Sequence, residues 1–321
     1  MKAKAVAHPM EGLVKYHGLR DWNLRIPFHD SISVNLDALN TLTEIEFGDF
    51  GEDTAIVDGQ KLAGREFERV KSVIDYVKQL SGIEENFHMV SRNSIPKGDV
   101  KGLGFSSSAG AALATAAYKA AGLDKKFGMD YRLLSRIARR LAGSACRSVV
   151  GDYARWFAGT SDEDSYAVRF AERRDFDIRV VVVPLNADFK TEDAHREAQS
   201  SPLFEAHVRA AQRRCDELQQ AIEKADFKKF GEIVELDALE LHAVTSTGPQ
   251  RMILSTPDSW RVVHRVYELR REGIECYFSM QTGPTVFINT LPENSSYVKS
   301  AAEDLGYRVI VSAVGGPAKI L

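Results

Sequence analysis

The chain has 321 residues, of which 44% are hydrophobic and 27% are charged. This composition is ordinary for a globular protein and excludes a disordered chain, a coiled coil and a collagen-like repeat. The 42 Lys and Arg residues nearly balance the 45 Asp and Glu residues, which gives a net charge of −3. That balance argues against a nucleic-acid-binding protein, although it is compatible with a local basic pocket for a small anion.

Cysteine usage and hydropathy predict a cytoplasmic protein. The three cysteines, Cys146, Cys215 and Cys276, form no CxxC pair, which argues against a structural zinc site. The first residues lack the apolar run of a signal peptide. The most apolar stretch, 180–183, is far shorter than the ~20 residues that a membrane span needs. We therefore expect a reducing compartment and no membrane partner.

The first hundred residues predict antiparallel strands followed by a helix. Polar and apolar residues alternate in 31–36 and 42–47, and this pattern predicts two strands with one buried and one wet face. The short connection between them is typical of a hairpin. A further strand is expected at 54–57. Apolar residues spaced from Phe67 to Val77 then predict an amphipathic helix.

A loop rich in Gly and Ser, 102–110, leads into an Ala-rich segment that predicts a buried helix at 111–121. An amphipathic, Arg-rich helix is expected at 131–141. The charged stretch 161–177 is interpreted as a surface connection, and the apolar run 178–185 as a buried strand.

The second half of the chain predicts long helices mixed with strands. The expected helices are 203–224, 227–243, 260–271 and 297–305, and the expected strands are 275–280, 285–289 and 308–312. This mixture favours an α+β fold over a doubly wound sheet. At ~150 residues per domain the length predicts two domains, and we place them at 1–180 and 181–321.

The loop 102–110 is the strongest local signal for chemistry. Glycines let a backbone approach a ligand closely, and serine hydroxyls with free N–H groups at a helix start bind anions. The loop therefore predicts a phosphate cradle, although the Walker A pattern GxxxxGK[ST] is absent. The same composition is also typical of a flexible loop without a ligand.

Two basic segments are further candidates. Lys15 and Arg20 in 8–21, together with Arg25, could form a cationic patch for a carboxylate or a phosphate. In 143–148, small residues surround Arg147, whose guanidinium could reach a buried anion. A solvated surface loop and a helix C-terminus are the structural alternatives for these two segments.

Taken in order, these segments resemble the mevalonate diphosphate decarboxylases of the GHMP kinase superfamily. Segment 15–21 is similar to their KYWGKRD sequence, 104–109 to their GLxSSA phosphate loop, 143–148 to GSACRS, and 283–284 to the GP of FDAGP. Segments 8–21, 28–34, 190–198 and 315–319 are similar, more narrowly, to the archaeal and bacterial mevalonate 5-phosphate decarboxylases. The resemblance covers essentially the whole chain.

The resemblance implies a GHMP kinase fold of the α+β class with the active site between two lobes. The N-terminal lobe would be ribosomal-protein-S5-domain-2-like and the C-terminal lobe ferredoxin-like. The implied reaction converts mevalonate 5-phosphate and ATP, with Mg2+, to isopentenyl phosphate, ADP, phosphate and CO2 in isoprenoid biosynthesis. The 3-hydroxyl would be phosphorylated first, and loss of phosphate and CO2 would then form the double bond. Relatives are commonly homodimers, so a homodimer is expected.

The resemblance also implies roles for single residues. The ATP phosphates would be held by Gly104, Ser106, Ser107 and Ser108, with Ser108 also near Mg2+ and among the catalytic residues. Arg147 would clamp the substrate carboxylate, and Lys15 would neutralise the transferring phosphoryl group; both are counted as catalytic. The expected substrate-binding set is Lys15, Tyr16, His17, Arg20, Ser144, Arg147, Lys190, His195 and Arg196.

Two positions depart from the family pattern. Leu19 stands where diphosphate-using relatives have Lys, which fits a substrate with one phosphate fewer. Gln281 stands at the catalytic Asp position, where the family has a base or an orienter of the 3-hydroxyl. A neutral amide cannot accept that proton. Gln281 fits either an inactivating change or a decarboxylase whose substrate arrives already 3-phosphorylated.

Several alternatives stay open. A small-molecule kinase of the same superfamily would stop after phosphorylation, and a mevalonate diphosphate decarboxylase would require the diphosphate. A 3-bisphosphate decarboxylase would need no ATP. A catalytically inactive ligand-binding relative is favoured slightly by Gln281. A nucleic-acid-binding module would require a salt-dependent affinity for RNA, and the near-neutral charge argues against it.

Overall fold

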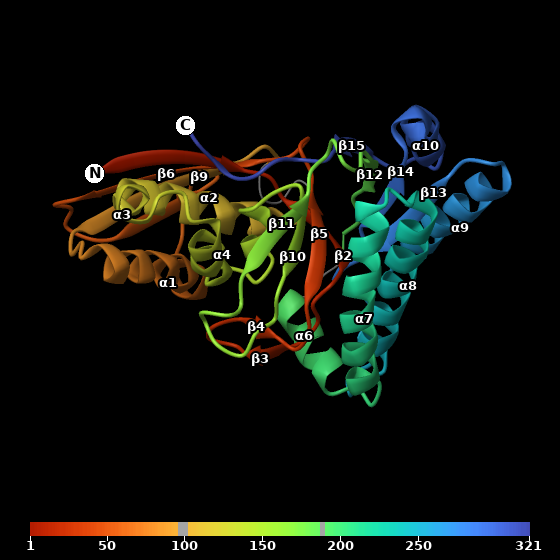
Figure 1. Ribbon diagram of the computed structural model, residues 1–321, viewed down its shortest axis with the longest axis horizontal. Helices are drawn as coiled ribbons and strands as arrows, with labels where there is room; N and C mark the ends of the chain where they lie inside the picture. The colour runs from red at the N-terminus through yellow and green to blue at the C-terminus, as the bar shows by residue number, and fades with distance from the viewer. Residues whose placement is uncertain (96–101, 187–189) are drawn as a thin grey trace.

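The computed structural model describes residues 1–95, 102–186 and 190–321 as layers of sheet and helix (Figure 1). The first sheet has the strand order β16-β1-β6-β9-β7-β8. Its strands are β1 (Lys2–Ala7), β6 (Thr41–Gly48), β7 (Thr54–Val57), β8 (Gln60–Lys61), β9 (Asn86–Asn93) and β16 (Lys319–Ile320). Alternate residues of β6 are buried, as the sequence pattern predicts, because one face of this sheet packs on a helix.

The second sheet has the order β11-β10-β5-β2 and lies in the middle of the molecule (Figure 1). Its strands are β2 (Met10–Val14), β5 (Ser31–Asn35), β10 (Tyr153–Trp156) and β11 (Ala167–Ala171). Every residue of β2 and β5 is buried, so the wet face predicted for 31–36 is wrong. The reason is that helices of both halves pack against this sheet. β11 lies inside the stretch that the sequence analysis interpreted as a surface connection.

The predicted hairpin of β5 and β6 does not form. β5 pairs with β2 and β10, whereas β6 pairs with β1 and β9, so the two strands belong to different sheets. Between them, the Leu36 N–H donates to the Pro9 carbonyl at 2.8 Å and the Asp37 N–H to the Ala313 carbonyl at 3.1 Å. These contacts turn the chain from one sheet into the other.

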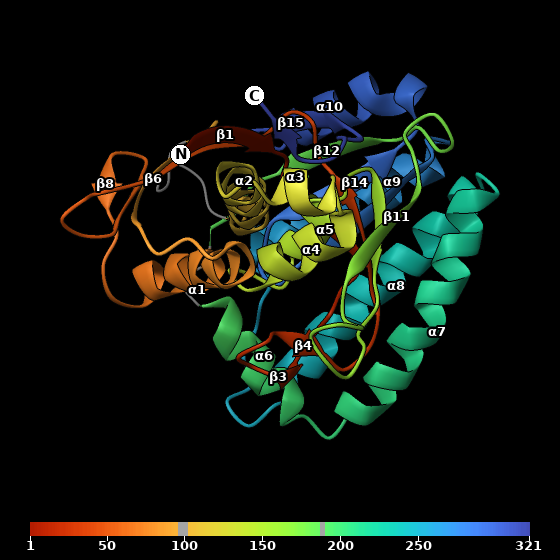
Figure 2. The same ribbon diagram turned by 60° about the vertical axis from the view of Figure 1, so that its left-hand side comes forward.

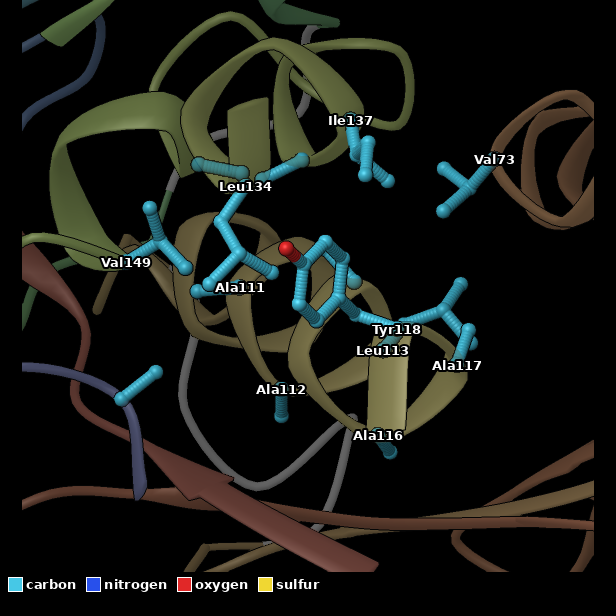
Figure 3. Packing of buried hydrophobic residues seen from close by; sticks show 14 of the residues in the cluster. Val73, Ala111, Ala112, Leu113, Ala116, Ala117, Tyr118, Leu134, Ile137 and Val149 are labelled. Carbon is cyan, nitrogen blue, oxygen red and sulfur yellow. The ribbon is translucent and has the colours of Figure 1, made fainter. Parts of the chain in front are cut away.

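The helices of the first half are α1 (Gly64–Ser81), α2 (Phe105–Ala120), α3 (Leu123–Phe127), α4 (Tyr131–Arg139) and α5 (Ala145–Ser148). α2 is buried, as its Ala-rich sequence predicts, but it begins at Phe105 rather than at 111. Figure 3 shows Tyr118 of α2 near Leu134 of α4. A Cβ on Gly110 would lie 2.6 Å from the Ala145 Cβ, so a glycine is needed where α2 meets α5.

The third sheet has the order β13-β14-β12-β15. Its strands are β12 (Arg179–Val183), β13 (Cys276–Met280), β14 (Val286–Thr290) and β15 (Ile310–Ala313). The accompanying helices are α6 (Thr191–Gln199), α7 (Phe204–Glu223), α8 (Phe227–Ser246), α9 (Pro257–Arg271), α10 (Ser295–Glu303) and the 3-10 turn η1 (Pro292–Asn294). α7 and α8 lie side by side (Figure 2). The helices and strands predicted for this half are confirmed.

Two features connect the halves of the molecule. The final strand β16 returns to the first sheet, where Ile320 pairs with Ala5 of β1. A small hairpin of β3 (Leu19–Asp21) and β4 (Ile26–Pro27) follows β2, and its Leu19 N–H donates to the Gln199 side chain of α6 at 3.2 Å. The division of the chain into domains at 1–180 and 181–321 stays a prediction. In the described part of the chain, no helix is both long and apolar enough to cross a membrane.

Candidate active site

A cavity of about 700 Å³ opens where the end of β2, the start of α2 and the turn after β13 meet. This size suits one or two small ligands. One part is lined by Thr43, Val57, Leu62, Met89, Ser91, Asn93, Leu103, Gly104, Phe105 and Ser106. The other part is lined by Gly12, Lys15, Tyr16, Ser144, Arg147, Thr191, His195 and Gln281. The first group includes Gly104 and Ser106, which the resemblance implies for ATP, and the second includes Lys15, Tyr16, Ser144, Arg147 and His195, which it implies for the substrate.

Arg147 is a buried cation on the cavity wall. It is 1% exposed, and its Nη1 donates to Ser31 Oγ and, at 3.5 Å, to the Ile32 carbonyl. The guanidinium carbon lies 5.6 Å from the Tyr16 ring centre and 5.7 Å from that of Trp156. No carboxylate of the described residues lies within ion-pair distance of it. A buried guanidinium without an anion is costly, so a carboxylate ligand would complete this site.

Lys15 is the second buried cation and follows β2 directly. Its Nζ lies 3.6 Å from Oδ2 of Asp237 in α8, and its backbone N–H donates to the same oxygen at 3.0 Å. Nζ has no hydrogen-bond acceptor within the described ranges. Burial lowers the pKa of Lys15, while the charges of Asp237 and Glu11 oppose that shift. Apart from this ion pair with Asp237, the ammonium can donate to a ligand.

His195 of α6 lines the cavity as a neutral donor. Its Nδ1 accepts a hydrogen bond from the Gly18 N–H at 3.1 Å, so the ring proton resides on Nε2. Burial, together with the charge of Arg25, lowers the pKa of His195 to about 4. The ring stacks on Tyr16 with centres 4.9 Å apart. This arrangement suits donation to a phosphate oxygen without adding a charge.

Tyr16 requires a close approach of the backbone beside it. A Cβ on Gly143 would lie 2.9 Å from the Tyr16 hydroxyl oxygen. The ring also meets Trp156 edge-on, with centres 5.0 Å apart. The small residues of 143–148 therefore make room for Tyr16, and Ser144 lines the cavity beside them.

Gln281 follows β13 and holds β2 with both ends of its side-chain amide. Its Oε1 accepts from the Gly12 N–H at 3.2 Å, and its Nε2 donates to the Met10 carbonyl at 3.4 Å. Its backbone carbonyl accepts from His242 Nε2 at 3.1 Å. Burial lowers the pKa of His242 to about 4. Gln281 is thus a neutral bridge between the halves of the chain.

The serines of the Gly/Ser loop differ in their surroundings. Ser106 is exposed and lines the cavity. Ser107 and Ser108 are buried: the Met10 N–H donates to Ser107 Oγ at 3.2 Å, and Ser108 Oγ lies 2.6 Å from Thr41 Oγ1. Because all three serines lie in the first turn of α2 rather than in a loop before it, the helix turns two of them away from the cavity.

Four other residues expected at the site do not line the cavity. His17 Nε2 donates to Thr245 Oγ1 at 2.7 Å, since that hydroxyl donates onward to the Leu241 carbonyl. Arg20 is exposed and lies over the Phe28 ring, and Arg196 lies over the Trp22 ring. Lys190 is exposed at the N-terminus of α6. None of these residues is among those that line the cavity in the described structure.

Three charged residues at or near the site belong to none of the sequence motifs. Glu66 and Arg69 of α1 line the cavity, and Arg69 donates to the Leu141 carbonyl through Nε at 2.9 Å. Asp237, which contacts Lys15, is 0% exposed. Glu66 and Arg69 lie in a helix with an ordinary charged face, so only the fold brings them to the cavity. Asp237 stands among apolar residues of α8, and that isolated acid in an apolar stripe was an available signal.

Comparison with known proteins identifies the class. The fold is the GHMP kinase fold: the structure of mevalonate diphosphate decarboxylase from Staphylococcus aureus has a TM-score of 0.92 at 31% identity, covering 100% of this chain and 98% of that one. The structure of MDDEF in complex with MVAPP, AMPPCP and magnesium has a TM-score of 0.91 at 29% identity, covering 100% and 99%. The fold class predicted from the sequence is confirmed.

The sequence comparisons identify the family. Residues 7–167 match the diphosphomevalonate decarboxylase-like N-terminal domain, and residues 189–305 match the mevalonate 5-diphosphate decarboxylase C-terminal domain. The phosphomevalonate decarboxylase of Haloferax volcanii is 39% identical over 100% of this chain and 98% of that protein. The diphosphomevalonate decarboxylase of Debaryomyces hansenii is 31% identical over 89% and 78%. The chain belongs to the diphosphomevalonate decarboxylase family, which consists of carboxy-lyases.

Proposed function

We propose that this protein converts mevalonate 5-phosphate and ATP to isopentenyl phosphate, ADP, phosphate and CO2. The observation that carries this proposal is Arg147, a buried guanidinium at the cavity with no carboxylate partner among the described residues. A planar cation of this kind pairs with a carboxylate through two hydrogen bonds. The substrate carboxylate is therefore the ligand that Arg147 would bind and orient for loss as CO2.

The remaining residues support the order of bond changes. A tertiary hydroxyl leaves poorly, so its oxygen first takes the γ-phosphoryl group of ATP, and ADP leaves. The hydroxyl proton passes to water, because the Gln281 amide cannot accept it. The C–O bond then breaks, phosphate leaves with the electron pair, and the electrons of the breaking carboxylate C–C bond form the alkene. The free N–H groups of Lys15 would neutralise charge on the transferring phosphoryl group. His195 would donate its Nε2–H to the 5-phosphate.

The nucleotide region of the cavity suits ATP. Gly104, the residue before α2, is in the left-handed conformation, with φ 74°, and no side chain caps the helix. Its first N–H groups and the Ser106 hydroxyl would bind the phosphates. Ser107 and Ser108 would have a structural role, because their hydroxyls stabilise the N-terminal turn of α2. The described residues contain no cluster of three or more His, Cys, Asp or Glu fit for a metal. Ser106 lines the cavity and would hold Mg2+ together with the nucleotide phosphates, and the ion would neutralise phosphate charge.

The surroundings of Leu19 favour a monophosphate over a diphosphate substrate. Leu19 is 2% exposed, and both its backbone N–H and its carbonyl pair with the Gln199 side chain at 3.2 Å. Where diphosphate-using relatives have a cation, this chain has a buried apolar residue. The absence of that cation fits a ligand with less negative charge.

A second candidate function is decarboxylation of a substrate that is already 3-phosphorylated. The observation that favours it is Gln281, because an amide held by Gly12 and Met10 cannot accept the hydroxyl proton. In that case a separate kinase would supply the substrate, and ATP would be unnecessary.

The experiment that separates these functions is a substrate panel with CO2 as the readout. Mevalonate 5-phosphate, mevalonate 5-diphosphate and mevalonate 3,5-bisphosphate are each incubated with and without ATP and Mg2+. The proposal expects CO2 from the monophosphate only with ATP, and slower CO2 release from the diphosphate. ATP-independent CO2 release from the 3,5-bisphosphate, without reaction of the monophosphate, would establish the second candidate instead. A phosphorylated product without CO2 would indicate a kinase.

A further inference from the structure

A connected set of buried charges leads from the cavity to the α7–α8 pair. Asp237 contacts Lys15 through Oδ2, and its Oδ1 lies 3.4 Å from Nη1 of Arg214 in α7. Arg214 Nη2 pairs with the Glu240 carboxylate, which accepts from His207 Nδ1 at 2.9 Å. Asp237 and Arg214 are 0% and 5% exposed. Burying these charges is costly, and their mutual contacts offset part of that cost.

Asp237 contacts both the backbone and the side chain of Lys15. One carboxylate oxygen accepts from the Lys15 backbone N–H at 3.0 Å and faces the Lys15 ammonium at 3.6 Å. A lysine side chain has many rotamers and would otherwise hold its ammonium loosely. Because Gln281 is neutral, the turn after β13 supplies no carboxylate to Lys15 in this chain. The carboxylate comes from α8 instead.

We propose that Asp237 is a positioning residue that fixes the Lys15 ammonium at the cavity wall, with Arg214 holding Asp237 in turn. The role in the reaction rests on the proposed function, because it requires Lys15 to contact the transferring phosphoryl group. The Lys15–Asp237–Arg214 coupling itself does not depend on which substrate the cavity takes.

The charges around Lys15 predict opposite shifts of the Lys15 pKa when Asp237 and Arg214 are neutralised. Asp237 of α8 and Glu11 of β2 raise the pKa of Lys15, whereas Arg214 of α7 lowers it. His242 of α8 also faces Lys15 and is neutral at pH 7, because its pKa is about 4. Removing the charge of Asp237 therefore lowers the Lys15 pKa further, and removing the charge of Arg214 raises it.

The test measures the titration of Lys15 directly, in protein labelled with 13C at the lysine ε-carbon. The Lys15 signal is assigned by its loss in Lys15→Met. We expect its midpoint to move to lower pH in Asp237→Asn, which keeps an acceptor for the Lys15 N–H. In Arg214→Gln it moves to higher pH. Asp216→Asn, a surface change on α7 at an acid paired with Arg155, leaves it in place. Opposite shifts cannot come from a general loosening of the fold.

Kinetics then connect the coupling to the reaction. In Asp237→Asn we expect kcat/KM for CO2 release to fall about a hundredfold, because the ammonium is no longer held in position. The alkaline limb of the pH profile of kcat/KM should shift in the same direction as the titration midpoint of Lys15. Midpoints that stay in place or move in the same direction in both variants would overturn the proposal. If Asp237→Asn does not fold, Arg214→Gln still tests the sign. If the wild type releases no CO2 while the opposite shifts are present, the proposed function fails and the coupling stands.

Discussion

The side-chain amide of Gln281 accepts the backbone N–H of Gly12 at 3.2 Å, across a sequence separation of 269 residues. This contact joins the turn after β13 to the strand β2, which carries the chain to Lys15. The same position would carry a carboxylate if the family pattern held. Because the side chain at position 281 is neutral, a substitution there tests most directly whether the reaction needs a carboxylate at this position.

Gln281→Asp is expected to raise the rate of CO2 release from mevalonate 5-phosphate. The new carboxylate would accept or orient the hydroxyl proton, which the amide cannot do. The shorter side chain would also lose its contacts to Gly12 and Met10, so stability should fall by about 1 kcal/mol. Turnover is measured by CO2 release, and stability by urea denaturation.

Gln281→Asn is the matched control for that change, because it shortens the side chain without adding charge. We expect it to lose similar stability and to gain no rate. If the Asp variant is no faster than the Asn variant, the role assigned to position 281 is wrong.

Arg147→Met should separate activity from stability. Loss of the carboxylate clamp is expected to lower kcat/KM about a hundredfold, which corresponds to about 3 kcal/mol of transition-state stabilisation. The same change removes a buried cation that has no anionic partner in the described structure, so the melting temperature should stay the same or rise. Calorimetry and steady-state kinetics check the two effects. A large fall in melting temperature would show that Arg147 is chiefly structural.

Ser106 and Ser108 should respond differently to removal of the hydroxyl. Ser106→Ala is expected to raise KM for ATP severalfold with little change in stability, because Ser106 lines the cavity. Ser108→Ala removes the partner of Thr41 and should cost about 1 kcal/mol of stability, with KM for ATP unchanged. The reverse assignment of these effects would contradict the proposed nucleotide region.

These serines also show how far a sequence pattern reaches. The Gly/Ser loop indicated phosphate binding, and the cavity does reach its helix start. The pattern could not distinguish Ser106 from Ser108. Which of these serines faces the cavity depends on where α2 begins, and in the folded protein α2 begins at Phe105. The amphipathic spacing in the second half predicted α7, α8 and α9, since each has its own apolar stripe. The sheet partners of β5 and β6 depend on distant strands, so local alternation could not reveal them.

The candidate site, like the fold, could be predicted only in part from the sequence. Lys15, Tyr16, Ser144, Arg147 and His195 could be named from motifs and all line the cavity. Arg20, Lys190 and Arg196 stand in the same motifs, but motif membership does not specify which way a side chain points. Asp237 belongs to no motif and meets Lys15 only because α8 packs on β2.

Stability should depend on pH through buried neutral histidines. Burial lowers the pKa of His29 to about 4, below the usual value of 6.5. The unfolded chain therefore binds more protons between these values, so stability is full above about pH 6.5 and falls as the pH drops towards 4. Urea denaturation at several pH values should show this fall. His29→Gln should make it shallower, whereas the same change at the exposed His264 should not. An unchanged slope in His29→Gln would contradict the assignment.

Glu11 should have the opposite effect. Burial raises the pKa of Glu11 from 4.5 to about 7, so the folded state binds more protons between those values. Stability from this group is present below about pH 4.5 and is lost as the pH rises through 7. Glu11→Gln, which keeps an acceptor for Asn289, should stabilise the protein at pH 8 by up to about 3 kcal/mol. Equal stability of the two proteins at pH 8 would mean that Glu11 is charged at little cost.

The central claim is that ATP-driven phosphorylation and decarboxylation occur together in this cavity. The most direct measurement follows mevalonate 5-phosphate labelled with 13C in its carboxyl group, with ATP and Mg2+, by 13C and 31P NMR in one sample. We predict one labelled CO2 and one isopentenyl phosphate for each ADP formed. ADP formed with the label retained in a phosphorylated acid, or no ADP at all, would contradict the account.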